Sequence, residues 1–262
     1  PEEYWTLDVI LKIKGEKRPL TAKFYGTDQK KMTIRSEQEL NEIVKKIENA
    51  EFKVSDIKTS ERFRKAPLPF TTSTLQQEAA KALNFGTQKT MRIAQQLYEG
   101  VDIKGGGTVG VITYLRTDST RIADEADASA REYIASVYGE KYIAAGQTKQ
   151  AEGKKIQDAH EAIRPTDISR TPASIKESLT RDQFRLYQLI WKRFAASRMM
   201  PAQYESTSVK IAAGQYRFSV STSRCVFDGF RSVYTEADEE KEESNVLVGH
   251  LSMEFCIYKR RF

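Results

Sequence analysis

The hydrophobic pattern of the chain changes its period twice, and this change constrains the fold more than any other feature. Apolar and polar residues alternate over Trp5–Leu11 and again over Leu20–Tyr25, which is typical of strands with one buried face. From Ser73 to about Pro201, apolar residues recur every three or four positions, which is typical of amphipathic helices. Beyond Pro201 the two-residue period returns. This order predicts an α+β fold, with a helical domain inserted into a β domain made from both ends of the chain.

Prolines mark the borders of the inserted domain. Pro67 and Pro69 stop regular structure before the helical period begins, and Pro201 closes that period. Because both predicted crossings of the chain lie beside these prolines, we expect a two-stranded hinge there. The predicted domains are residues 1–73 for the first part of the β domain, 74–201 for the helical domain, and 202–262 for the second part of the β domain.

Capping signals and turn residues predict the individual elements. Helices are expected over Ser36–Ile47, Ser73–Gly86, Thr87–Gly100, Asp124–Tyr138 and Thr180–Pro201, with a short helical turn over Ile156–Arg164. A hairpin at Ala213–Gly214 and a strand over Cys225–Tyr234 are expected in the second β part. The two short helices joined at Asn84–Thr87 resemble a helix-turn-helix, a shape used on DNA, although such pairs more often serve only core packing.

The distribution of charge favours an anionic partner. The formal charge is +6, and Glu61–Arg92 holds six basic residues against two acidic ones. Acidic residues gather instead in Glu236–Glu243, far along the chain. Basic charge in one region and acidic charge in another fits a ligand with a phosphate backbone.

Several classes of protein are excluded by composition. Cys225 and Cys256 do not have the spacing of a zinc site, and adding His250 does not supply it. We expect both cysteines to stay reduced in a cytoplasmic protein. No apolar run is long enough to span a membrane, and no signal peptide is recognisable, so no membrane association is expected. The chain begins abruptly in a strand-like segment, which we interpret as part of a longer protein.

The segment Val109–Thr120 carries the first candidate site. Its alternation predicts a strand, on which Tyr114 and Arg116 project from the same face about 7 Å apart. A phenol beside a guanidinium suits an oxygen nucleophile that attacks phosphorus, with the arginine neutralising the phosphate charge. A Tyr-x-Arg pair alone is more often an ordinary half-buried tyrosine beside a solvated arginine.

His160 and Arg164 form the second candidate pair. On a helical turn, residues four apart share a face, so the two side chains can bracket a phosphate while the imidazole exchanges a proton. The alternative is a capping histidine and an arginine that stabilises a helix C-terminus. Together with Tyr114 and Arg116, these cations could activate a phenol that is otherwise a poor nucleophile at neutral pH.

Tyrosine attack on DNA keeps the bond energy in a phosphotyrosine link, so that strands can be rejoined without ATP. Two classes of enzyme work in this way. Tyrosine recombinases place the tyrosine after an HxxR motif, whereas here Tyr114 precedes His160 and the spacing to Arg164 is HxxxR. The recombinase interpretation is therefore poor.

The second class fits four motifs in the same order. Ile112–Thr120 resembles the active-site motif of the type IA DNA topoisomerases of bacteria. Pro69–Ala79 and Leu186–Tyr204 resemble the entry to and the return from their helical gate domain, and Ala159–Pro165 resembles their histidine motif. The resemblance covers about residues 1–235, and the tail 245–262 matches nothing recognisable.

The resemblance implies a role for each candidate residue. Tyr114 forms a 5′-phosphotyrosine and Arg116 holds the scissile phosphate, while His160 contacts a nearby backbone phosphate. The weaker DNA-binding candidates are Ser119, Thr120 and Arg164. The family architecture, a helical gate domain on a β arch that swings open, agrees with the α+β expectation. The implied partner is single-stranded or negatively supercoiled DNA, bound by a monomer.

The magnesium of these enzymes is held by a Toprim domain, which the resemblance places outside the 262 residues. Asp124, Glu125 and Asp127 begin a helix, where acids favour the helix dipole, so no metal is expected on this chain. The chain alone is therefore expected not to relax DNA. The alternative is a non-catalytic gate module that binds single-stranded DNA and carries the tyrosine passively.

Overall fold

The computed structural model describes residues 4–11, 20–144, 160–235 and 257–261. The acidic run Glu236–Glu243, Cys256 and residues 156–159 of the predicted helical turn lie outside these ranges. The fold is α+β, as predicted. The chain forms two compact units, residues 1–62, 204–225 and 243–262 in the first and residues 63–203 and 226–242 in the second. The sequence predicted domain borders that differ from this division, at 1–73, 74–201 and 202–262. Those borders stay predictions.

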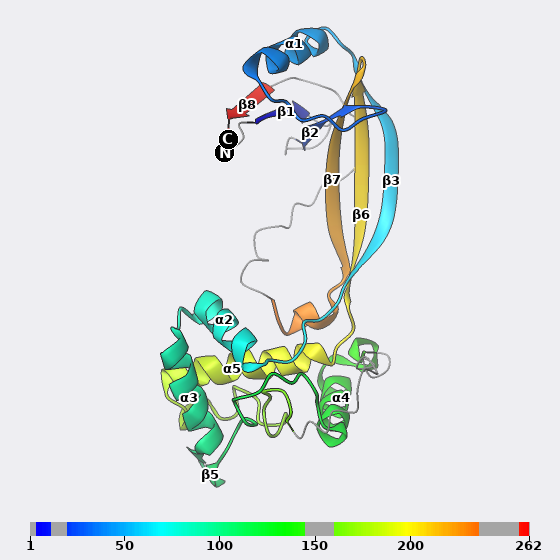
Figure 1. The fold of residues 1–262 in the computed structure, drawn as a ribbon. Coiled ribbons are helices and arrows are strands. Elements are labelled where there is room, and N and C mark those ends of the chain that lie inside the picture. Colours follow the sequence, from blue (N-terminus) through cyan, green and yellow to red (C-terminus); the bar gives the residue numbers. More distant parts are fainter. Residues whose placement is uncertain (1–3, 12–19, 145–159, 236–256, 262) are drawn as a thin grey trace. The chain divides into compact units, whose positions relative to one another are not determined.

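The first unit is built on a six-stranded sheet in the order β3-β6-β7-β2-β1-β8, seen with its long strands side by side in Figure 1. The strands are β1 (Trp5–Leu11), β2 (Leu20–Thr27), β3 (Phe52–Arg64), β6 (Ala202–Ala213), β7 (Tyr216–Phe227) and β8 (Ile257–Arg261). β1 pairs antiparallel with both β2 and β8. The end of the unmatched tail is thus a strand of the sheet.

Among the described residues of this unit, α1 (Glu37–Ile47) is the helix that contributes to the core. Ser36 caps it as predicted, since its hydroxyl accepts the amide of Glu39 at 3.2 Å. In a capping box, the Glu39 carboxylate would accept the amide of Ser36 in return. Here it accepts the amide of Arg35 instead. Four apolar residues of α1 join the buried side chains of the sheet: Leu40, Ile43, Val44 and Ile47.

The hairpin at Ala213–Gly214 is confirmed, with Gly214 at a φ of 56° between β6 and β7. The strand predicted over Cys225–Tyr234 is wrong beyond Phe227. β7 ends at Phe227, and a 3₁₀ turn, η3 (Gly229–Ser232), follows. Gly229 has a φ of 49°, and a β-carbon there would collide with backbone of Met200 and Pro201, so the chain turns back against the end of the helical region.

The second unit packs its helices around α5 (Arg181–Ser197), with α2 (Thr72–Leu83) and α3 (Thr87–Glu99) beside it (Figure 1). The remaining elements are α4 (Asp124–Tyr138), the 3₁₀ turns η1 (Glu140–Tyr142) and η2 (Lys176–Ser178), and a small hairpin of β4 (Val101–Ile103) and β5 (Gly107–Val109). Two buried polar groups of α5 fasten a neighbouring segment: the Tyr187 hydroxyl donates to Arg170 O at 2.6 Å, and the Trp191 indole donates to Ile168 O at 2.9 Å. Burial raises the pKa of Tyr187, which keeps its phenol neutral as a donor.

The start of α2 differs from the prediction. Thr71, not Ser73, is the N-cap, and it forms a capping box with Thr74. At the other end Asn84, in the left-handed conformation, ends the helix before Gly86 caps α3. The Ser73-x-x-Gln76 signal therefore lies two residues too late, inside the first turns of the helix.

Asp127 of α4 accepts two charge-assisted bonds, one from within its own helix and one from Arg198 at the end of α5. Its carboxylate accepts Arg198 Nη1 at 2.8 Å and Arg131 Nε at 2.6 Å, and Asp127 and Arg198 are both buried. Burial alone would raise the pKa of Asp127, but the hydrogen bonds and charges of Arg131 and Arg198 outweigh it and lower the pKa. The carboxylate is therefore an anion held in the core of the unit.

Asp127→Asn is expected to lower the free energy of unfolding at neutral pH by about 3 kcal/mol, because it leaves the buried guanidinium of Arg198 without its anion. Since the folded pKa lies below the ordinary value of 3.8, this contribution is complete above that value and is lost as the pH falls through the folded pKa. Urea unfolding at a series of pH values from neutral to acidic should therefore show that the free energy of unfolding falls less for the variant than for the wild type. Glu132→Gln, an exposed site on the same helix, is the control, and equal pH profiles for Asp127→Asn and wild type would contradict the assignment.

Candidate active site

Tyr114 lies in an irregular segment and not in the predicted strand. β5 ends at Val109, and only Ile112 forms an isolated bridge, to Pro165. Val111 and Ile112 are consecutive and both buried, so this part of the segment is enclosed on two sides. The predicted strand is therefore wrong, while Tyr114 and Arg116 are both exposed and Leu115 between them is buried.

The histidine segment is also extended where a helical turn was predicted. Ile163 bridges to Phe70 and Pro165 bridges to Ile112, while His160 lies outside any helix. Ala162 and Ile163 are both fully buried, which fits a segment enclosed on two sides. His160 and Arg164 therefore do not share a helical face.

Backbone and side-chain bonds of Thr113 join the tyrosine segment to the histidine segment. The Thr113 hydroxyl donates to Ala162 O at 2.7 Å and accepts the amide of Arg164 at 3.0 Å. The Thr113 amide donates to Arg164 O at 2.9 Å. The residue before Tyr114 is thus fixed against the residues that follow His160.

The Tyr114 ring lies in a small aromatic group at the surface. Its centroid is 6.1 Å from that of His160 and 5.5 Å from that of Tyr98, which meets it edge to face. Tyr114 is 43% exposed and Tyr98 39%. Tyr98, at the end of α3, lies at the surface, although its spacing along the helix is that of a buried residue. The structure thus places the predicted Tyr114 and His160 together and adds Tyr98, which the sequence did not single out.

The residues after Tyr114 lie at or near the surface. Arg116 is exposed, and Ser119 and Thr120 are half-buried. The Ser119 hydroxyl accepts the amide of Arg121 at 3.2 Å, and Arg121 O in turn accepts the amide of Ala162. Arg121, which directly follows the motif, thus pairs through its backbone with the histidine segment, a connection that sequence analysis missed.

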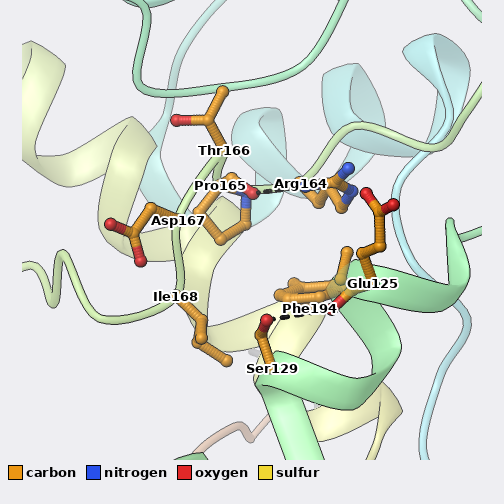
Figure 2. A pocket seen from close by; sticks show the side chains of 9 residues that line it. Glu125, Ser129, Arg164, Pro165, Thr166, Asp167, Ile168 and Phe194 are labelled. Carbon is orange, nitrogen blue, oxygen red and sulfur yellow. Dashed lines mark hydrogen bonds between the residues drawn. The ribbon is translucent and has the colours of Figure 1, made fainter.

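Arg164 is turned away from this group. Its guanidinium donates to Glu161 at 2.6 and 2.9 Å and to Pro165 O at 3.0 Å, and its side chain is only 13% exposed. It lines a cavity of about 260 Å³ together with residues of α4, the 165–168 segment and Phe194. Figure 2 shows the Arg164 and Glu125 side chains pointing toward each other at one end of that cavity.

The described residues do not fit a magnesium site. Asp127 is committed to two arginines, and within residues 4–11, 20–144, 160–235 and 257–261 no three His, Cys, Asp or Glu side chains gather in a way that could hold a metal ion. Cys225 is a free thiol. The described residues bring a phenol, an imidazole and a guanidinium to this site. In the described part of the chain, no helix is long and apolar enough to cross a membrane.

This set of groups suits phosphoryl transfer to a tyrosine oxygen, and comparison with known proteins gives the class. A family model described as DNA topoisomerase matches residues 1–253, so the chain belongs to that family, the type IA topoisomerases. The chain is also similar to full-length topoisomerase I from Thermotoga maritima, with 38% sequence identity and a TM-score of 0.76. That match covers 99% of this chain and 40% of the Thermotoga chain. The predicted resemblance is confirmed, and the family match extends from the predicted end near 235 into the tail.

Thr113→Val is expected to destabilise the helical unit by about 1–3 kcal/mol, because Ala162 O and the Arg164 amide each lose a partner at a buried junction. Thr113→Ser keeps the hydroxyl, so it should lose clearly less stability than Thr113→Val. Urea unfolding of the two variants measures the difference. Equal losses for valine and serine would show that the hydroxyl does not hold the two segments together.

Proposed function

We propose that this chain is the strand-cleaving part of a type IA topoisomerase and that Tyr114 is its nucleophile. The observation that carries the proposal is the position of Tyr114, exposed at the surface with its ring beside His160, within a chain of this family. The family supports a DNA substrate. The single-stranded or negatively supercoiled form, the covalent step and the roles of individual residues are our proposal.

In the proposed reaction the Tyr114 hydroxyl oxygen attacks a phosphorus of one DNA strand. The bond from oxygen to phosphorus forms, the bond from phosphorus to the 3′ oxygen breaks, and the DNA keeps a free 3′-hydroxyl. The phenol gives up its proton, the leaving oxygen takes one, and the strand remains attached through its 5′ phosphate. Because the bond energy is retained, the reverse reaction rejoins the strand without ATP after another strand has passed, and negative supercoils are relaxed.

Cationic groups around Tyr114 supply the electrostatic part of this reaction. Arg116 neutralises the charge that develops on the scissile phosphate, since a guanidinium can bond two phosphate oxygens at once. His160 binds a neighbouring backbone phosphate, and Ser119 and Thr120 offer hydroxyl donors in the same region. Arg164 is the weakest DNA-binding candidate, because Glu161 already occupies its guanidinium.

The rest of the protein supplies what these residues lack. By similarity to a relative of which this chain spans 40%, we propose that a Toprim domain brings the acidic residues and Mg²⁺. Magnesium there would assist binding and positioning of the DNA phosphates, and no ligand for it is assigned to this chain. We further propose that the complete protein acts as a monomer in the cytoplasm.

Tyr114→Phe in the complete protein is expected to abolish the covalent DNA adduct and to leave folding unchanged, because only the phenolic oxygen is removed. A single-stranded oligonucleotide labelled at its 3′ end should transfer its label to the wild type with magnesium, since the 5′-phosphate link retains the downstream piece. Tyr98→Phe is the matched control, as it removes a neighbouring hydroxyl, and it should still form the adduct. An adduct that persists in Tyr114→Phe contradicts the proposal. A wild type that binds the oligonucleotide but is never trapped supports the non-catalytic gate module instead.

The 262-residue chain alone is expected to bind single-stranded DNA weakly and not to relax supercoiled plasmid at any magnesium concentration. The reason is that the described residues offer no acidic cluster to hold the metal. Gel electrophoresis of plasmid topoisomers measures relaxation, and the complete protein serves as the positive control. Relaxation by the isolated chain would show that the site is complete without the Toprim domain.

A further inference from the structure

A threonine hydroxyl at the start of α2 holds the turn that carries Arg116. The Thr72 hydroxyl donates to Leu115 O at 2.7 Å, with Thr117 O also within 3.1 Å, and accepts the amide of Thr117 at 2.8 Å. The Thr72 amide donates to Thr117 O at 2.9 Å. Leu115 and Thr117 are both buried, so water cannot replace these bonds.

The capping box of α2 explains why Thr72 is available for this contact. The Thr71 hydroxyl accepts the amide of Thr74, and the Thr74 hydroxyl accepts the amide of Thr71. These bonds fix the first turn and make Thr72 the first helical residue. The first amides of a helix have no partner within the helix. Here the amide of Thr72 bonds the backbone beside Arg116.

Arg116 depends on this backbone contact for its position. Among the described residues, its side chain makes no hydrogen bond and no ion pair, and it is exposed. Its neighbours on both sides, Leu115 and Thr117, are the ones that Thr72 bonds. Tyr114 in turn lies between Thr113, fixed to the histidine segment, and Leu115.

We propose that Thr72 is a positioning residue for strand cleavage, which aligns Arg116 with Tyr114 by holding the Leu115–Thr117 turn. The proposal rests on the proposed roles of Tyr114 and Arg116. It also gives the entry segment of the helical unit a direct connection to the site, because the backbone of Phe70, two residues earlier, accepts the amide of Ile163. One short segment, Phe70–Thr72, thus contacts both the tyrosine and the histidine segments.

Thr72→Val in the complete protein tests the proposal, because it keeps the shape and removes the hydroxyl. We expect the rate of adduct formation on a saturating 3′-labelled oligonucleotide to fall about tenfold or more, since small displacements of a catalytic group are costly. Affinity for the oligonucleotide should change less than about twofold, because the phosphate contacts of ground-state binding remain. Thr72→Ser should recover most of the rate.

Thr90→Val is the matched control. Thr90 is fully buried in α3, and its hydroxyl donates to Gly86 O at 3.1 Å within the same helix. The variant should lower stability without changing the cleavage rate of the folded protein. If Thr72→Val and Thr90→Val slow cleavage equally, Thr72 is merely structural and the proposal fails. In an Arg116→Lys background, Thr72→Val should lose most of its effect, because its action passes through the arginine.

Amide exchange gives a readout that does not need activity. Thr72→Val removes the acceptor of the Thr117 amide, so exchange at Thr117, measured by NMR, should accelerate about tenfold or more, and Thr90→Val should leave it unchanged. Unchanged exchange at Thr117 would overturn the proposal even if cleavage slowed. If the wild type forms no adduct, the proposed function fails, while the exchange data still decide whether Thr72 holds the turn.

Discussion

The junction between Thr113 and the backbone of Ala162–Arg164 is the interaction on which the candidate site depends. It joins two irregular segments that are about fifty residues apart in sequence, and it brings Tyr114 beside His160. Neither segment is a helix or a strand, so neither has a ladder of its own to keep it in place. Their buried residues and a few specific hydrogen bonds replace that ladder.

Within residues 111–116, the buried side chains hold the backbone in place and the exposed side chains are free to meet a substrate. Val111, Ile112 and Leu115 are buried and anchor the segment, whereas Tyr114 and Arg116 between and beyond them are exposed. The proposed nucleophile, exposed on an anchored backbone, can meet a large, flexible substrate without first being uncovered. This division fits a DNA strand as the substrate of a chain that belongs to the topoisomerase family.

Sequence patterns predicted the regular elements well and the irregular ones poorly. Local signals were sufficient where the cause is local, as at the Ser36 and Thr180 caps. The predicted strand around Tyr114 and the predicted turn before Arg164 were wrong, because both segments are held by partners distant in sequence. Motif resemblance still selected Tyr114 and His160, which the structure places together. Tyr98 was missed because its spacing is that of a buried helical residue. Thr72 was missed because the predicted helix begins one residue later, at Ser73.

The most direct test of the central claim is to identify the residue that carries the DNA in the trapped adduct. Trypsin separates the two neighbouring candidates, because Tyr114 falls in the peptide 105–116 and Tyr98 in the peptide 93–104. After nuclease digestion of the adduct formed by the complete protein, mass spectrometry should find the added nucleotide on 105–116, linked through a 5′ phosphate to Tyr114. A nucleotide on 93–104, or on any other peptide, would contradict the account.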